Sequence, residues 1–218
     1  MNSKITLLKH AVVLYTFVFL VWGVYRYLFR LPEEIEEIIL KPLIWLGPTF
    51  WLVAKEKGNL SSVGWSGKNL FKSLYLGIGL GVLFAFLGFG THLLKYGEVA
   101  FIKLAFLATP SLFTSALIVS FLTAITEETA FRGYIFNRLQ QVLGSEWQAN
   151  LISSFGWALV HLPITIFVFH YNFFQMLVFL GLSFVFGMGS AFVFARTKTI
   201  TASVLLHVFW SWPIILFR

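Results

Sequence analysis

Long apolar runs dominate the chain, and seven of them are long enough, or nearly so, to cross the ~30 Å hydrocarbon core of a bilayer. The expected spans lie near His10–Leu28, Leu40–Ala54, Leu70–Gly90, Pro110–Ile125 and beyond, Ala149–Phe169, Phe173–Ala195 and Ile200–Phe217. A weaker segment, Ala100–Ala108, would be an eighth. The pattern predicts an all-α, polytopic membrane helix bundle that forms one transmembrane domain over residues 1–218, with its chemistry in residues 111–218.

Local sequence adds detail to three places in this bundle. Gly47-Pro48 breaks the short second span, so we expect a tilt or a kink there. The acidic segment Pro32–Glu37 looks like the first turn of an amphipathic helix, and we expect it to be solvated and structural. Small residues allow close helix packing, and three of them share the third span: Gly77, Gly79 and Gly81.

Composition supports lipid as part of the solvent. The 218 residues are 58% hydrophobic and 11% charged, with a mean hydropathy of +0.83, against roughly 25% charged in soluble domains. The net charge of +7 comes from Lys and Arg that flank the spans, so nucleic-acid binding is not expected. The chain contains no Cys and no Asp, which excludes a thiol nucleophile and a pair of catalytic aspartates.

The distribution of Lys and Arg predicts the orientation. With seven spans, one side collects Lys4, Lys9, Lys55, Lys57, Lys68, Lys72, Arg132, Arg138, Arg196 and Lys198, and the other collects Arg26, Arg30, Lys41, Lys95, Lys103 and Arg218. The richer side should be cytoplasmic. We therefore expect a multi-pass protein of the cytoplasmic membrane with its N-terminus inside and its active site open to the cytosol.

Ionisable residues at membrane depth are costly and mark candidate functional sites. Glu128 and Arg132 are four residues apart and should form an ion pair on one helix face. Glu127 points ~100° away from Glu128, and its own i+4 neighbour, Phe131, carries no charge. An unpaired carboxylate in a low-dielectric site is suited to general-base catalysis.

Two histidines in later spans are candidate partners for Glu127. Counting residues into each span places His161, His207 and Glu127 at one depth, roughly 10–18 Å below the surface. Ser211 follows His207 by four residues and shares its helix face. His170 is out of phase with His161, and His10 and His92 look interfacial, with no role.

Other protease chemistries fit the sequence less well. A His-Glu-x-x-His zinc motif is absent. The string Gly64-Trp65-Ser66-Gly67 resembles a serine-protease motif, but it lies in a polar stretch and is interpreted as a loop. A catalytic zinc site made of Glu127, His161 and His207 remains chemically reasonable, because three N/O ligands leave an open fourth position.

The order and spacing of three motifs resemble the CAAX prenyl endopeptidase and bacteriocin-processing family of intramembrane proteases. Its Glu-Glu-x-x-x-Arg motif matches Glu127–Arg132, its Phe-x-x-x-His motif matches Trp157–His161, and its His-x-x-x-Asn motif matches His207–Ser211. Trp157 replaces the usual Phe, and Ser211 replaces the usual Asn. The resemblance covers about half the chain.

That resemblance implies a glutamate-based endopeptidase that cleaves a protein or peptide substrate near the membrane surface, without a cofactor. Glu127 and His161 would activate water, and His207 with Ser211 would stabilise the oxyanion. Glu128, Arg132 and Trp157 would support the site. Two alternatives stay open: a non-catalytic member that acts in scaffolding or bacteriocin self-immunity, and a transporter whose Glu and two His form a transit site.

Overall fold

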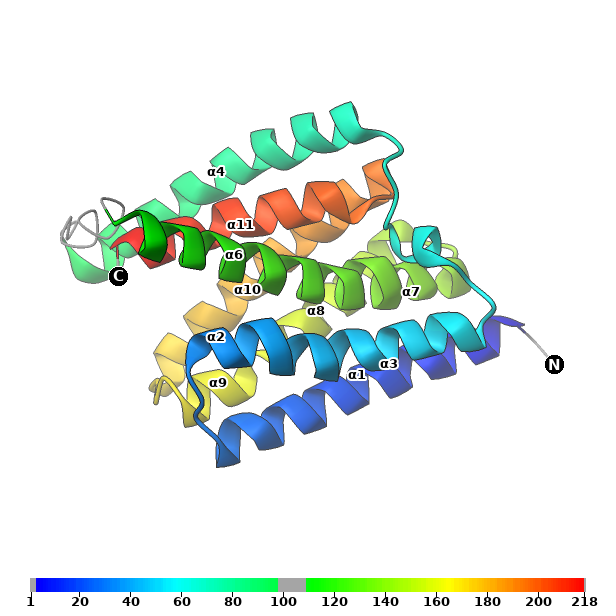
Figure 1. The fold of residues 1–218 in the computed structure, drawn as a ribbon, viewed down its shortest axis with the longest axis horizontal. Helices are drawn as coiled ribbons and strands as arrows, with labels where there is room; N and C mark the ends of the chain where they lie inside the picture. Colours follow the sequence, from blue (N-terminus) through cyan, green and yellow to red (C-terminus); the bar gives the residue numbers. More distant parts are fainter. Residues whose placement is uncertain (1–2, 98–108, 218) are drawn as a thin grey trace.

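The computed structural model describes residues 3–97 and 109–217, which form a bundle of long helices (Figure 1). The described residues contain no strand, so the predicted all-α fold is confirmed. The helices in chain order are α1 (Ser3–Leu28), α2 (Glu33–Ile35), the π-helical turn η1 (Glu36–Leu40), α3 (Lys41–Lys55), the short 3₁₀ helix η2 (Leu60–Val63), α4 (Leu70–Tyr96), α6 (Pro110–Glu128), the π-helical segment η4 (Thr129–Phe136), α7 (Asn137–Leu143), α8 (Glu146–Val160), α9 (Leu162–Phe167), α10 (Phe173–Thr197) and α11 (Ile200–Phe217).

The predicted spans are present as helices. Six helical runs in the described part of the chain are long and apolar enough to cross a bilayer: Ser3–Leu28, Glu33–Lys55, Leu70–Leu94, Ser111–Leu143, Glu146–Phe167 and Phe173–Thr197. A shorter apolar run, Ile200–Trp212, lies in α11 and corresponds to the seventh. The weaker segment Ala100–Ala108 lies outside the described residues.

The second span begins earlier than predicted. Helix continues from Glu33 through η1 into α3, and Pro48 sits inside α3 without ending it. The prediction that the whole acidic segment is solvated is wrong, because Glu36 and Glu37 are buried. They are buried because cations from α1 and α3 neutralise them.

The span around His161 is interrupted. Sequence predicted one segment over Ala149–Phe169, whereas α8 ends at Val160 and α9 begins at Leu162. Pro163 lies in the first turn of α9, where its missing N–H costs nothing, but it cannot continue the hydrogen-bond ladder of α8. His161 is therefore placed at the break between two helices.

The glutamate helix runs through the centre of the bundle. As predicted, helix continues past Glu127 and Glu128, from α6 through η4 into α7. The widened turns of η4 bury all eight of its residues, and π-helical turns often occur at functional sites. A Cβ added at Gly133 would lie 2.3 Å from the Val63 carbonyl oxygen, so glycine allows η2 to press against η4.

Small residues join α4 to α11, which lie side by side in Figure 1. Added Cβ atoms at Gly77 and Gly81 would meet Ala202 and Phe209 of α11, at 2.8 Å and 3.0 Å. Gly79 has no such neighbour. The predicted packing face is thus formed by the two glycines spaced four residues apart. Ser66 lies in the loop before α4, as predicted.

Candidate active site

Glu127 lies in the last turn of α6 and is 5% exposed. The expectation that it is unpaired is wrong, because Lys41 Nζ of α3 lies 2.7 Å from its Oε1. Lys41 is equally buried, at 5% exposed, and belongs to a segment 86 residues away in the chain. Local spacing around Glu127 could not reveal this partner.

Glu128 is fully buried and forms the predicted ion pair, with Arg132 Nε 3.2 Å from its Oε2. Two further groups contact the same carboxylate: the Ser190 hydroxyl donates to Oε2, and His207 Nδ1 lies 2.9 Å from Oε1. Sequence reasoning assigned Glu128 to Arg132 alone. In the structure Glu128 also orients a histidine, as carboxylates near functional imidazoles commonly do.

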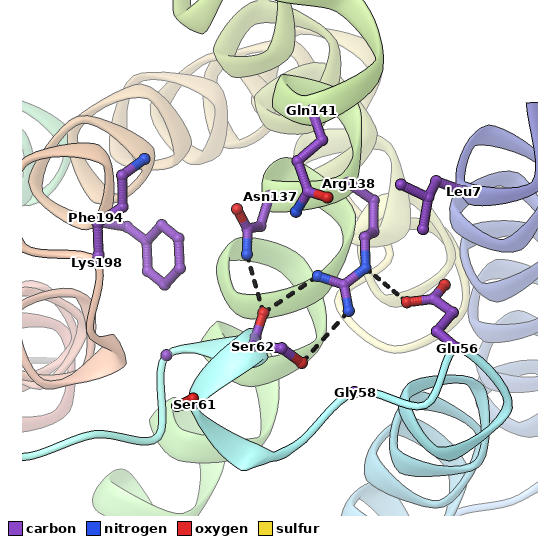
Figure 2. Close-up of a pocket in the computed structure, with 11 residues that line it drawn as sticks. Leu7, Glu56, Gly58, Ser61, Ser62, Asn137, Arg138, Gln141, Phe194 and Lys198 are labelled. Atoms are coloured by element: carbon purple, nitrogen blue, oxygen red, sulfur yellow. Dashed lines mark hydrogen bonds and ion pairs between the residues drawn. The ribbon is translucent and has the colours of Figure 1, made fainter. Parts of the chain in front are cut away.

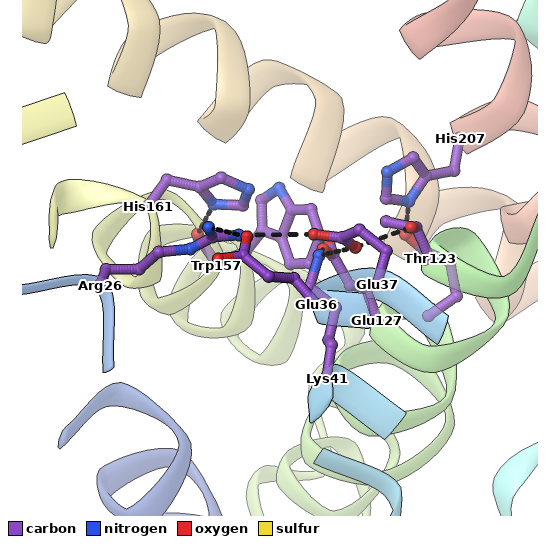
Figure 3. A network of polar contacts seen from close by, with 10 residues as sticks. Arg26, Glu36, Glu37, Lys41, Thr123, Glu127, Trp157, His161 and His207 are labelled. Carbon is purple, nitrogen blue, oxygen red and sulfur yellow. Dashed lines mark hydrogen bonds and ion pairs between the residues drawn. The ribbon is translucent and has the colours of Figure 1, made fainter. Parts of the chain in front are cut away.

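Trp157 is the apolar centre of the site. The guanidinium of Arg132 lies 4.3 Å from its ring centroid, and Phe131 packs edge-on against it at 5.1 Å. Both candidate histidines contact the same indole, with centroid distances of 4.7 Å for His161 and 5.7 Å for His207. Figure 3 shows the two imidazoles on either side of Trp157.

The helix break fixes the tautomer of His161. Its backbone N–H bonds to the Ala158 carbonyl, which leaves the Trp157 carbonyl without its usual i+4 backbone donor. His161 Nδ1 lies 2.8 Å from that carbonyl oxygen. Because a carbonyl only accepts, Nδ1 carries the proton and Nε2 of the neutral ring is a free acceptor.

His207 presents the same arrangement, with a carboxylate as the acceptor. Its Nδ1 donates to the Glu128 carboxylate, so its Nε2 faces away from Glu128. Both imidazoles are close enough to the Glu127 carboxylate to interact with it electrostatically. The structure therefore brings together the three residues that the sequence placed at one depth, and Figure 3 shows them around Lys41.

Ser211 does not contribute a free donor in this arrangement. Its hydroxyl donates to the Val208 carbonyl of its own helix, at 3.1 Å. The shared face with His207 follows from the helical spacing, but this hydrogen bond turns the hydroxyl back toward the α11 backbone.

An acidic brace, defined as Arg26, Glu36, Glu37 and Lys41, extends the site and was missed by sequence reasoning. Arg26 pairs with Glu36 and, at 3.4 Å, with Glu37, and Glu37 in turn pairs with Lys41. The Thr123 hydroxyl donates to Glu37 at 2.7 Å. A signal existed, because the string Glu-Glu-x-x-x-Lys at 36–41 repeats the pattern of 127–132 with Lys for Arg.

A second polar cluster lies at the other end of the bundle, around the loop before η2 (Figure 2). Arg138 pairs with Glu56 at 2.8 Å and donates to the Ser62 carbonyl at 3.1 Å. His10, expected to have no role, contacts Glu56 at 2.9 Å. The cluster borders a cavity of about 310 Å³ that Lys198 also lines. Burial lowers the pKa of the Lys198 ammonium, and Glu146 opposes this change.

A three-ligand metal site is not formed by the side chains of the described residues. No group of three His, Cys, Asp or Glu among them is arranged to hold a metal ion. The zinc set Glu127, His161 and His207 fits poorly for a further reason: the ammonium of Lys41 already pairs with the Glu127 carboxylate.

A bundle of apolar spans with ionised residues buried at its centre defines a class, the multi-pass α-helical membrane proteins. Residues 109–213 match the family model described as type II CAAX prenyl endopeptidase Rce1-like. The C-terminal half of the chain, which contains all three motifs, is thus similar to the CAAX protease family. No significant match was found among curated proteins or among solved structures.

Proposed function

We propose that this protein is a membrane-embedded endopeptidase that hydrolyses a peptide bond with a glutamate-activated water molecule. One observation carries the proposal: His161 and His207 flank Trp157 in the interior of the bundle, and both interact electrostatically with the Glu127 carboxylate. The family match supports the protease class, and the geometry supports the roles assigned below.

The attack step uses Glu127 and His161. A water molecule gives one proton to the Glu127 carboxylate, while its other hydrogen bonds to the free Nε2 of His161. The water oxygen forms a bond to the carbonyl carbon, and the C=O electron pair moves onto oxygen. When the tetrahedral intermediate collapses, the C–N bond breaks and Glu127 returns the proton to the leaving amine.

The developing oxyanion is assigned to His207. To donate from Nε2 as well as from Nδ1, the ring must be an imidazolium, and the Glu128 carboxylate 2.9 Å from Nδ1 is its counter-ion. The arrangement is preorganised because Arg132 and Ser190 hold Glu128 in place.

The proposal is tested with purified protein in lipid vesicles and a library of membrane-anchored peptides. We expect site-specific cleavage that continues after exhaustive chelation, with no stoichiometric metal found by elemental analysis. Stoichiometric zinc whose removal abolishes cleavage, and whose return restores it, would replace this mechanism by a metal-dependent one. Peptide binding without cleavage would instead favour the non-catalytic scaffold or self-immunity function. The observation that supports this alternative is the Ser211 hydroxyl, which donates to the backbone of its own helix.

Substitutions at Ser211 should have small effects compared with those at His207. Ser211→Ala removes a hydroxyl that is bonded to its own helix, whereas His207→Ala removes an oxyanion donor, typically worth ~3–4 kcal/mol. Ser211→Asn should be tolerated and should raise kcat, because the longer amide reaches beyond the helix backbone. The measurement is kcat for the three variants. Loss of cleavage in Ser211→Ala as complete as in Glu127→Gln would identify Ser211 as a nucleophile.

We propose that a substrate reaches the site along η1 and α6. A cleft of about 500 Å³ is lined by Ile38 of η1 and by residues of α6 that precede Glu127: Ser111, Thr114, Ser115 and Ile118. In Figure 1 this part of the bundle lies at the end opposite the N-terminus. A substrate that enters through this cleft would therefore come from the side of the membrane opposite the N-terminus.

We propose that the N-terminus is cytoplasmic and that the cleft faces the other side of the membrane. Buried cations that form ion pairs do not lie in loops and so do not indicate the orientation. Without Arg26, Lys41, Arg132 and Arg138, eight Lys and Arg residues remain on the side of the N-terminus and four on the other side. In this Cys-free chain, Ser66→Cys should react with impermeant reagents only from the cytoplasmic side, and Leu31→Cys only from the opposite side. The reverse pattern would overturn this orientation.

A further inference from the structure

We propose that Lys41 is a positioning residue of the site, held by the acidic brace so that its ammonium keeps the Glu127 carboxylate ionised and oriented. The inference deepens the proposed endopeptidase function and rests on it. It assigns a purpose to the segment before α3, which lies outside the matched residues 109–213.

The contact between Lys41 and Glu127 joins the two halves of the chain through two buried charged groups. Lys41 Nζ lies 2.7 Å from Glu127 Oε1 and also pairs with Glu37. An ammonium at this distance stabilises the ionised form of the carboxylate. With Oε1 occupied by Lys41, Oε2 is the oxygen left to accept a proton from water. Orientation and charge are both properties that the general base needs.

The position of Lys41 is itself determined by neighbours. Glu37 accepts from Lys41, from Thr123 of α6 at 2.7 Å and from Arg26 at 3.4 Å. Arg26 is anchored by Glu36, which also accepts from the Tyr25 hydroxyl at 2.6 Å. Each charged group thus has at least two partners, and groups fixed in this way require little reorganisation during a reaction.

Two aromatic rings enclose the ammonium. Lys41 Nζ lies 5.4 Å from the ring centroid of Trp22 and 5.9 Å from that of Trp45. These faces attract a cation and limit its contact with water, so the charge of Lys41 acts on its two carboxylates with little screening. Figure 3 shows the Lys41 side chain reaching toward Glu127 and Glu37 between the two histidines.

The same local pattern builds both sides of the site. Glu37 and Lys41 form an i,i+4 pair beside the π-helical turn η1, and Glu128 and Arg132 form one at the start of η4. In each pattern the first pair partner is preceded by a second glutamate, Glu36 or Glu127. The Arg132 pair supports His207 through Glu128, and the Lys41 pair supports Glu127 directly. One ion pair therefore supports the proposed oxyanion donor, and the other supports the proposed general base.

The test compares Lys41→Met with a matched variant at the other end of the bundle. Arg138→Met also removes a buried cation from a carboxylate, that of Glu56, but outside the site. Both variants should lose stability. Only Lys41→Met should lower kcat, by about 10–100-fold as is typical for groups that support catalytic residues, with KM unchanged. Lys41→Arg keeps the charge with a different shape and should recover part of kcat.

A second readout does not depend on cleavage. Membrane-permeant carbodiimides react with protonated carboxyl groups, and mass spectrometry locates the adduct. Glu127 should be labelled at least several-fold more in Lys41→Met than in wild type, Lys41→Arg or Arg138→Met. Where Lys41→Met does not fold, Lys41→Gln replaces it, since it removes the charge and keeps a donor.

The two readouts separate the inference from the proposed function. If wild type does not cleave the peptides, the endopeptidase function fails, and labelling still decides whether Lys41 controls the ionisation of Glu127. If folded Lys41→Met, or Lys41→Gln in its place, keeps wild-type kcat or wild-type labelling at Glu127, Lys41 only joins helices and the inference is overturned.

Discussion

Replacing Glu127 by glutamine should lower kcat by about 10²–10⁴-fold, the usual contribution of a general base, while the protein remains folded. Glutamine has nearly the same shape but cannot take a proton from water. Its amide oxygen can still accept from Lys41 Nζ, and Lys41 keeps its second carboxylate, Glu37. The variant therefore removes the chemistry and leaves the acidic brace intact.

The measurement is kcat for vesicle-reconstituted wild type and Glu127→Gln, with unfolding of both followed in detergent. Glu56→Gln is the matched control, because it neutralises a partly buried carboxylate that is paired with a cation at the opposite end of the bundle. It should reduce stability without reducing kcat of the folded protein. Wild-type kcat in Glu127→Gln would remove Glu127 from the mechanism and favour a different base.

Much of the fold follows from apolar runs, because lipid restricts a spanning segment to a helix of fixed minimum length. The seven predicted spans reappear as helices. The boundaries of a span were predicted wrongly where paired polar residues or a proline alter the apolar run. The second span begins at Glu33 because neighbouring cations neutralise Glu36 and Glu37, and no hydropathy window contains that information. The break at His161 was signalled by Pro163, a local effect that hydropathy also ignores.

The candidate site shows the same division between local and distant interactions. The Glu128–Arg132 pair follows from an i,i+4 spacing within one helix. The sequence also allowed His161 and His207 to be grouped with Glu127, because the helical rise per residue converts residue counts into depth in the membrane. Lys41 could not be assigned in this way, because its contact with Glu127 depends on how α3 packs against α6. The available clue was that Lys41 ends a Glu-Glu-x-x-x-Lys string, which repeats the Glu-Glu-x-x-x-Arg pattern of residues 127–132.

Replacing Arg132 by alanine should destabilise the protein by ~3–5 kcal/mol, the usual cost of breaking a buried ion pair. Glu128 has no exposed surface, and without Arg132 its charge is left with the Ser190 hydroxyl and His207. The variant also removes a guanidinium that stacks on Trp157 at 4.3 Å, so the indole between the two histidines loses support. Stability and cleavage should therefore fall together. The free energy of unfolding in detergent is the measurement.

Three further variants separate charge from packing at this position. Arg132→Lys keeps the charge but loses the planar stacking on Trp157, so it should recover only part of the stability. Glu128→Gln in the Arg132→Ala background removes the buried carboxylate that has lost its guanidinium partner, and it should be more stable than Arg132→Ala alone. Arg196→Ala, at a partly exposed pair with Glu146, should cost only ~0–1 kcal/mol. If Arg132→Ala resembles Arg196→Ala in stability and cleaves normally, Glu128 does not depend on Arg132, and the carboxylate that orients His207 is stabilised by other groups.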